Sequence, residues 1–206
     1  YITVYHLTIK KAYADMYCRQ GENLEKAGKY PESIISYKRA LELAPKVDYY
    51  CAELARAQQR AGNYTEAEST LKRAMGLNPG NPFHYAQIAR LYADWSAKLP
   101  ADSSERTTKL NSAFIYYGIQ AVLSPTNPQV YREMGEVYER QGDYQAAVLK
   151  YQQAIKMDDQ LSDIWFRLGK AYQQGQDVAR MIDAYERAFK LGNKQPRAEL
   201  GKLGED

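Results

Sequence analysis

Residue types recur along this chain at intervals of 34, and this period constrains the fold more than any other feature. Tyr30 and Ala40 are matched 34 residues later by Tyr64 and Ala74. The interval lengthens once, by twelve residues, after position 79 and then returns. Other pairs at the same spacing are Pro45 and Pro79, Gly28 and Gly62, Gly135 and Gly169, Tyr151 and Tyr185, and Ala154 and Ala188. A period of about 20–50 residues in independent residue types indicates stacked structural repeats.

Each period contains the pattern of two helices joined by a turn. Between residues 48 and 81, Ala67, Leu71 and Ala74 follow one another at intervals of four and three, which places them on one helix face. Gly62 supplies the left-handed backbone that ends a first helix, and Pro79 cannot continue the second. Small residues recur where two helix axes must approach closely. We therefore expect an all-α fold of antiparallel helix pairs.

These residues resemble the tetratricopeptide repeat. The stretch "VYREMGEVYERQGDYQAAVLKYQQAIKMDD" is similar to the family pattern over its whole length, with a small residue after a large apolar one and a Gly turn followed by an aromatic. The resemblance implies a right-handed α-solenoid of about five helix-turn-helix repeats. The expected divisions are an N-terminal extension (1–13), an array (14–194) of repeats 14–47, 48–81, 82–127, 128–161 and 162–194, and a capping helix with a tail (195–206).

The chain departs from the repeat pattern at the ends of two helices and at one turn. Asp159 and Asn193 stand where the family has proline. Gly175 comes one residue early relative to Gly142, when the two turns are aligned by the period. We therefore expect the last turn to begin one residue sooner than the others.

The third repeat carries the twelve extra residues. Its pattern predicts a first helix that continues past Trp95 to about Lys98, and a loop over 99–102. Ser103 or Asp102 would then cap an early second helix. Both helices should project beyond their neighbours by one to two turns. Two interpretations of the projection stay open: a surface that contacts a partner, or a tolerated elongation of a helical hairpin.

The two ends of the chain have separate roles in this interpretation. At the C-terminus, Pro196 would begin a helix whose face of Ala198, Leu200 and Leu203 covers the last repeat, because solenoids need a terminal cap. At the N-terminus, residues 1–10 are apolar and β-branched. They would extend the first helix, or they are the remnant of a segment that leads from a membrane span.

Composition excludes several classes of protein. A formal net charge of +3 is too balanced for a dedicated nucleic-acid binder, and no apolar run reaches the length of a membrane span. Most of the 19 tyrosines occupy repeating aromatic positions, which favours core packing over stacking on sugars or bases. Cys18 and Cys51 lack metal-ligand spacing; they are buried free thiols or, as the alternative, one disulfide.

Charged and aromatic residues on the first helices form the candidate binding surface, since first helices line the concave face of such an array. One repeat separates Arg56 from Arg90, and Arg60 lies one turn from Arg56. The aromatic residues of the same positions, Tyr49 and Phe83, would flank them. The full predicted set is Tyr49, Arg56, Arg60, Phe83, Gln87, Arg90 and Arg132.

This set predicts an anion site beside an apolar shelf, which suits a peptide or protein segment of mixed charge. The alternative is a solvated face on which Arg56 or Arg60 pairs within the chain, for example with Glu53. Some members of the family bind the C-terminal carboxylate of chaperones through a Lys and Asn clamp. Its positions here hold Cys18, Glu22, Glu53, Phe83 and Gln87, so that mode is disfavoured.

The chain lacks the sequence signatures of catalysis. It contains no HExxH, GxSxG, P-loop or GxGxxG motif, and its two histidines offer little for metal or triad chemistry. We therefore expect a non-catalytic binding module without catalytic residues, metal or cofactor. Its partner would be a protein or peptide and not a nucleic acid.

A narrower resemblance concerns bacterial envelope proteins. The stretches "ADMYCRQGENLEKAGKYPESIISYKRALELAP" and "YYGIQAVLSPTNPQVYREMGEVY" are similar to the C-terminal repeat region of O-antigen ligase or polymerase-like membrane proteins. This resemblance implies an accessory domain tethered to a bacterial membrane, with any catalysis in a membrane part outside this chain. The alternative is a scaffold without such a tether.

Overall fold

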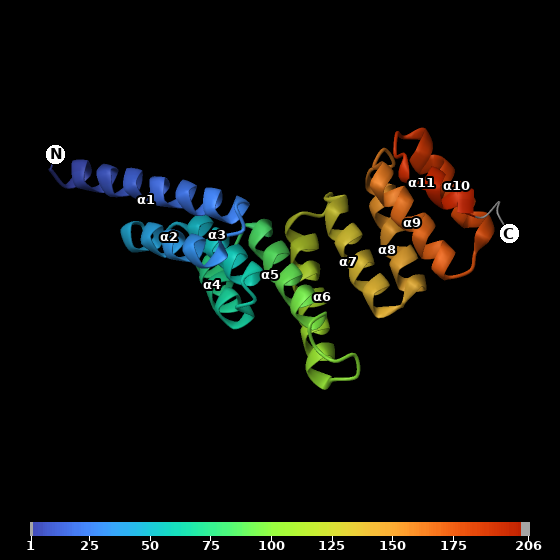
Figure 1. Ribbon diagram of the computed structural model, residues 1–206, viewed down its shortest axis with the longest axis horizontal. Coiled ribbons are helices and arrows are strands. Elements are labelled where there is room, and N and C mark those ends of the chain that lie inside the picture. The colour runs from blue at the N-terminus through green and yellow to red at the C-terminus, as the bar shows by residue number, and fades with distance from the viewer. Residues whose placement is uncertain (1, 203–206) are drawn as a thin grey trace. The chain divides into compact units, whose positions relative to one another are not determined.

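The computed structural model describes residues 2–202, and side chains between residues 8 and 199 (Figure 1). Within this range every regular element is an α-helix, which confirms the expected all-α class. The helices are α1 (Ile2–Lys26), α2 (Tyr30–Leu43), α3 (Asp48–Arg60), α4 (Tyr64–Leu77), α5 (Pro82–Ser96), α6 (Ser104–Leu123), α7 (Pro128–Gln141), α8 (Tyr144–Met157), α9 (Ser162–Gln174), α10 (Val178–Lys190) and α11 (Gln195–Lys202).

Most successive helices pack against each other, as repeated helix pairs require. Helix α1 packs on α2, α3 on α4, α7 on α8 and α9 on α10, and each of the pairs α2 with α3, α4 with α5 and α8 with α9 is also in contact. The chain divides into two compact units, one up to Ile119 and the other from Gln120 onward. In the first unit α1, α3 and α5 lie next to one another, and they carry most of the predicted binding residues.

Side-chain caps mark the start of several helices. Asn81 and Asn127 each accept a hydrogen bond from a backbone N–H of the next helix, and each is followed by a proline, which fits the first helical position. Asp143 and Asp177 cap α8 and α10 in the same way.

The turns keep the 34-residue register, including the turn that was expected to shift. Gly28, Gly62 and Gly142 have positive φ angles of 73°, 84° and 78°. The equivalent of Gly142 one repeat later is Gln176, which has a φ of 60°, whereas Gly175 has a φ of −80°. The expected early turn is therefore wrong. Packing of the flanking helices holds the register, and a non-glycine residue takes the left-handed conformation there.

A glycine and a tyrosine pack against each other within three of the repeats. A Cβ placed on Gly21 would lie 2.7 Å from the ring of Tyr37, closer than real side chains approach. The same contact recurs between Gly135 and Tyr151 and between Gly169 and Tyr185. These three tyrosines are fully buried, and Tyr50, Tyr92, Tyr117 and Tyr172 are also buried, so core packing accounts for part of the tyrosine content. Cys18 and Cys51 are buried free thiols, which rules out the disulfide alternative.

The third repeat is elongated mainly in its second helix. Helix α6 has 20 residues against 14 in α4 and α8, whereas α5, with 15, is scarcely longer than its counterparts. The first helix ends at Ser96, so the expected projection of both helices is wrong for α5. Ser103 caps α6 by accepting a hydrogen bond from the N–H of Arg106 at 3.1 Å.

One lysine holds the added turn of α6 to the first unit. The Nζ atom of Lys109 lies 3.4 Å from the ring centre of Trp95 and 5.4 Å from that of Tyr92. Trp95 in turn stacks on Tyr64, with centroids 5.6 Å apart. A cation over stacked aromatic rings is stabilising, particularly where water is partly excluded. The elongation is thus a packed part of the unit.

The ends of the described chain are helical. Helix α1 begins at Ile2 and is continuous through the predicted extension, and none of the described helices is long and apolar enough to cross a membrane. Helix α11 packs on α10 and buries Pro196. Ala198 was expected on the face that covers the last repeat, but it is exposed, so this part of the prediction is wrong. Leu203 of that face and the side chain of Leu200 lie outside the described part of the chain.

Candidate functional site

The candidate site lies along α1, α3 and α5 of the first unit. Helix α3 supplies Tyr49, Arg56 and Arg60, and α5 supplies Phe83, Gln87 and Arg90 of the predicted set. Two pockets follow these helices, of about 340 Å³ and about 250 Å³. Both are lined by Arg56 and Arg60, which therefore lie between them. Five of the seven predicted residues line these two pockets, whereas Phe83 and Arg132 do not.

Arg56 is already paired with carboxylates of its own chain. Its Nε and Nη2 atoms donate to the two oxygens of Glu25, both at 2.9 Å, and its Nη1 donates to Glu53 Oε1 at 3.0 Å. Nη2 also donates to the second oxygen of Glu53. Both carboxylates are buried. The alternative prediction, pairing within the chain, is therefore confirmed for Arg56.

The two buried carboxylates differ in their electrostatics. Burial alone would raise the pKa of Glu25, but hydrogen bonds and charge from Arg56, the hydroxyl of Tyr37 and the charge of Arg60 hold it below its usual range. Burial raises the pKa of Glu53, and Arg56 offsets only part of this effect. Glu25, Glu53, Arg56 and Arg60 form one ion-pair cluster. In this cluster Glu25 is the carboxylate that stays ionised to lower pH, and Glu53 is the carboxyl group that gains a proton more easily.

Arg60 is the more accessible arginine of the cluster. Its Nη1 lies 3.0 Å from Glu25 Oε1, while about half of the Arg60 side chain is exposed. It lines both pockets together with Arg56. Because a guanidinium has five N–H donors, a single carboxylate contact leaves donors that can reach a ligand.

The smaller pocket contains a buried amide with an unpartnered acceptor. Gln87 is 8% exposed, and its Oε1 atom accepts no hydrogen bond. Arg90 and Asp94 line the same pocket, and Asp94 accepts a hydrogen bond from Gln59 Nε2 at 2.7 Å. A buried polar atom without a partner is uncommon and calls for an explanation, such as a water or a ligand group that donates to it.

The two residues of the predicted aromatic shelf have exposed side chains in the first unit. Tyr49 and Phe83 are exposed by 47% and 45%. The hydroxyl of Tyr49 donates to Glu22 Oε1 at 2.9 Å, which fixes its ring at the edge of the larger pocket. Large apolar groups of this exposure can contact a partner without rearranging the core.

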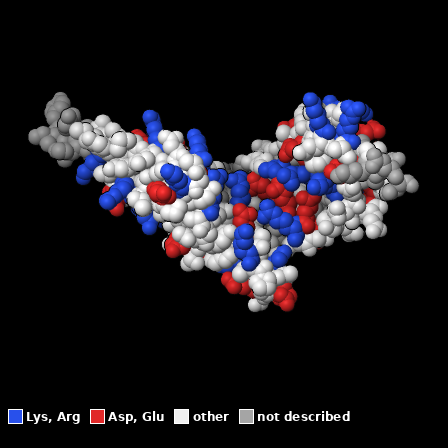
Figure 2. Space-filling model, viewed as in Figure 1, with Lys and Arg blue, Asp and Glu red and all other residues white. Residues whose placement is uncertain are grey.

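Arg132 lies on α7, in the second unit. Its Nε donates to Gln129 Oε1 at 3.0 Å and its Nη1 pairs with Glu136, while Arg167 approaches the same Glu136 oxygen at 3.2 Å. Arg132 is thus engaged in its own ionic cluster. Figure 2 shows acidic and basic side chains interleaved on the visible face rather than separated into patches of one sign.

Family models match both units of the chain. A tetratricopeptide-repeat model matches residues 24–93, a second matches 162–193, and a TPR-repeat model matches 140–175. Together these matches span more than half of the chain. The chain belongs to the tetratricopeptide-repeat family. A comparison with curated proteins gives no match.

Solved structures share the fold over about nine tenths of this chain. TTC0263, a thermophilic TPR protein of Thermus thermophilus, is 20% identical with a TM-score of 0.70, covering 92% of this chain and 97% of its own. MamA is 17% identical with a TM-score of 0.65, over 90% and 94% of the two chains. YrrB, a TPR protein with an unusual peptide-binding site, is 13% identical with a TM-score of 0.60, over 90% of each chain.

Glu25, at the centre of the ion-pair cluster with Glu53, Arg56 and Arg60, was not predicted from the sequence. Glu25 pairs with Arg56 and Arg60 and also accepts a hydrogen bond from Tyr37 at 3.1 Å. The signal was available, because Glu139 stands twelve residues before Tyr151 just as Glu25 stands before Tyr37. Among the residues that the structure describes, no cluster of His, Cys, Asp and Glu could hold a metal ion.

Proposed function

We propose that this tetratricopeptide-repeat protein is a non-catalytic interaction scaffold whose first unit binds a peptide or protein segment of mixed charge. The observation that carries the proposal is the pair of pockets that share Arg56 and Arg60. One pocket adds acidic side chains and the exposed ring of Tyr49, and the other adds Gln87 and Arg90. The two pockets together form the groove of the first unit. A single peptide segment bound along this groove would contact acidic side chains, basic side chains and an aromatic ring at its edge.

The cluster of ion pairs assigns separate roles to the arginines in this proposal. Arg56 orders the groove because both buried carboxylates hold it. Arg60, which is half exposed, and Arg90 would pair with a carboxylate of the bound segment. The unpartnered oxygen of Gln87 would accept an N–H from the peptide main chain after a small adjustment of the amide. Preorganised donors of this kind favour binding because little side-chain entropy is lost.

A peptide library displayed against the full chain tests the proposal. We expect selected sequences to combine acidic, basic and aromatic or aliphatic residues. The double variant Arg60→Glu and Arg90→Glu should weaken their binding at least tenfold, while the exposed Arg39→Glu on α2 serves as the control. Equal binding by both variants would contradict the assignment of the groove.

A finer alternative places this scaffold on an O-antigen ligase or polymerase-like membrane protein. It rests on the sequence resemblance alone, and the proposed groove would then recruit proteins to a glycan-transferring enzyme. Determination of the gene sequence upstream of Tyr1 tests it: a series of apolar segments supports the tether, and a soluble start nearby contradicts it.

A further inference from the structure

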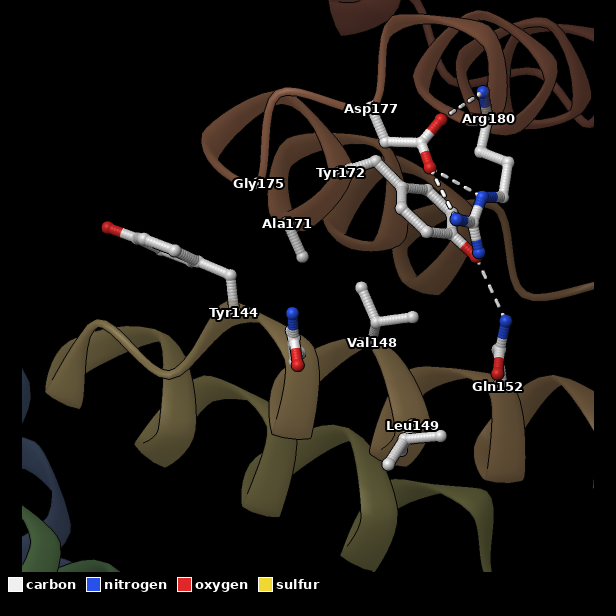
Figure 3. A pocket seen from close by; sticks show the side chains of 10 residues that line it. Tyr144, Val148, Leu149, Gln152, Ala171, Tyr172, Gly175, Asp177 and Arg180 are labelled. Carbon is white, nitrogen blue, oxygen red and sulfur yellow. Dashed lines mark hydrogen bonds and ion pairs between the residues drawn. The ribbon is translucent and has the colours of Figure 1, made fainter.

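A second groove runs between α8 and α10 in the second unit, with α9 as its floor. It contains two compartments, of about 350 Å³ and about 440 Å³, that share Gln152, Tyr172 and Arg180. All of its lining residues lie within the second unit, away from the residues assigned above. Figure 3 shows the first compartment, where Val148 of α8 and Ala171 of α9 point towards one another.

The side chains of Gln152, Tyr172 and Arg180 lie between the two compartments and are called the polar bar below. Gln152 Nε2 donates to the hydroxyl of Tyr172 at 2.9 Å, and the guanidinium of Arg180 lies 5.1 Å from the centre of the Tyr172 ring. Asp177 holds Arg180 in place through its Oδ2 atom, 2.6 Å from Nε (Figure 3). These contacts place Gln152, Tyr172 and Arg180 next to one another between the two compartments, and apolar groups line each side.

The apolar groups lie mainly on the α8 side and on the floor. Val148 and Leu149 line the first compartment, and Ile155, Trp165 and Leu168 line the second. The α10 wall is charged instead. A groove with one apolar wall and one charged wall matches the two faces of an amphipathic helix.

The spacing of the two compartments predicts the sequence pattern of a helix that would bind there. Val148 and Ile155 are seven residues apart on α8, which is about 10 Å along a helix axis. A bound helix parallel to α8 would place apolar side chains at positions i and i+7 in the two compartments. Its residue at i+4 would then face the polar bar and needs a hydrogen-bonding side chain.

Two charged residues at the edge of the groove determine which faces of a bound helix point towards α8 and towards α10. Lys156 on α8 and Asp183 on α10 both line the second compartment and are exposed. Among the described residues, neither forms an ion pair with an opposite charge. A partner helix with an acidic residue towards α8 and a basic residue towards α10 complements both.

We infer that the α8–α10 groove binds an amphipathic helix of a partner protein, with apolar residues at i and i+7, a polar residue at i+4 and charges that face Lys156 and Asp183. The groove would give the scaffold a second binding surface, independent of the first unit. The volume of each compartment lies within the range of ligand pockets.

A synthetic helix tests this inference on the full chain. The probe is a fluorescein-labelled peptide of about 16 residues, with Leu at i and i+7, Gln at i+4 and a Glu placed to face Lys156. We expect saturable binding in fluorescence anisotropy. A peptide with both leucines replaced by alanine should bind at least tenfold more weakly. Equal binding of the two peptides, or no binding of the leucine peptide, would overturn the inference.

The repeat itself offers a matched pair of variants. Leu149 and Ile35 occupy the same repeat position and are exposed by 63% and 61%. Leu149→Glu should weaken the leucine peptide at least tenfold, while Ile35→Glu on α2 should leave it unchanged, and circular dichroism checks that both variants fold. Equal effects of the two variants would place the binding elsewhere.

Three further measurements identify the occupant. With Trp95→Phe, the emission of Trp165 should shift to shorter wavelength on binding, because Trp165 lines the second compartment. Lys156→Glu should weaken the peptide, and a peptide with Lys in place of its facing Glu should recover the loss. Sedimentation of the chain alone covers another occupant: self-association that Leu149→Glu abolishes would mean a second copy fills the groove and would overturn the inference.

Discussion

The two units use the same contact with opposite electrostatic results. Glu25 in the first unit and Glu139 in the second hold one repeat position, and each accepts a hydrogen bond from the tyrosine twelve residues later, at 3.1 Å and 2.9 Å. The pKa of Glu25 lies below its usual range. Burial raises the pKa of Glu139, and the hydroxyl of Tyr151 and nearby cations offset this only in part.

The difference comes from the following repeat. Thirty-one residues after Glu25 stands Arg56, which grips both carboxylate oxygens. Thirty-one residues after Glu139 stands Lys170, whose Nζ atom lies over the ring of Phe166, 5.9 Å from its centre. A guanidinium matches a carboxylate with two parallel bonds, and an ammonium does not. The tyrosine contact is thus the same within each helix pair, and the residue from the neighbouring repeat determines the direction in which the glutamate pKa shifts.

The largest effect is expected from removing Arg56. Arg56→Met leaves Glu25 and Glu53 buried with their main counterion gone, and should lower the free energy of unfolding of the first unit by about 3 kcal/mol. Urea unfolding followed by Trp95 in a Trp165→Phe background measures it. Arg39→Met, which breaks an exposed pair with Glu42, is the control and should cost less than about 0.5 kcal/mol. Similar costs would show that the cluster does not stabilise the unit.

The second largest loss of stability is expected from adding a methyl group to the glycine that packs against Tyr151. Gly135→Ala places a Cβ 2.5 Å from the ring of Tyr151 and should cost about 2 kcal/mol, since the ring must move in a packed core. The second repeat has Ala55 and Leu71 at the same two positions, both buried. Adding Tyr151→Leu should therefore recover part of the loss in thermal unfolding. If Gly135→Ala were neutral or stabilising, the space between Gly135 and the ring of Tyr151 would have to be large enough for a methyl group, which would contradict the close contact.

The pH dependence separates Glu139 from Glu25. Folded Glu139 holds its proton to higher pH than the unfolded chain, so its contribution to stability falls as pH rises above the usual glutamate pKa. Glu139→Gln should remove this slope, and the equivalent Gln173 already accepts a hydrogen bond from Tyr185 at 3.0 Å. Glu25→Gln should do the reverse and remove stability that is present at neutral pH and lost in acid. Urea titrations between acid and neutral pH compare the two, and parallel slopes would refute the distinction.

The smallest change sharpens the same comparison. Lys170→Arg should give Glu139 a partner like Arg56 and lower its pKa, which carboxyl chemical shifts in a pH titration can follow. Stability should change by less than about 1 kcal/mol. An unaltered titration of Glu139 would mean that the helix geometry, and not the residue type, keeps the cation away.

The sequence predicts the fold well because the period repeats the same packing problem. Gly62, Pro79 and the small residues at helix crossings were enough to place the helix pairs. The register at Gln176 could not be read locally, since packing of the flanking helices overrides the preference of Gly175. The length of α5 was also misjudged, because the extra residues can join either helix of a hairpin without changing the periodic pattern.

The candidate site was only partly predictable. Period and charge brought Arg56, Arg60 and Arg90 to neighbouring helices, as expected. The sequence alone could not decide which arginine is held within the chain, since that depends on the depth of Glu25 and Glu53 below the surface. The α8–α10 groove was missed because its apolar residues also read as ordinary core positions.

The saturation of Arg56 affects what kind of ligand the first unit can distinguish. A small inorganic anion that reached this guanidinium would have to displace two carboxylates that cannot leave, so it would gain little. A longer ligand escapes this competition, because it can spread its contacts over several helices. The internal neutralisation of one arginine thus acts as a filter against free ions and in favour of extended molecules.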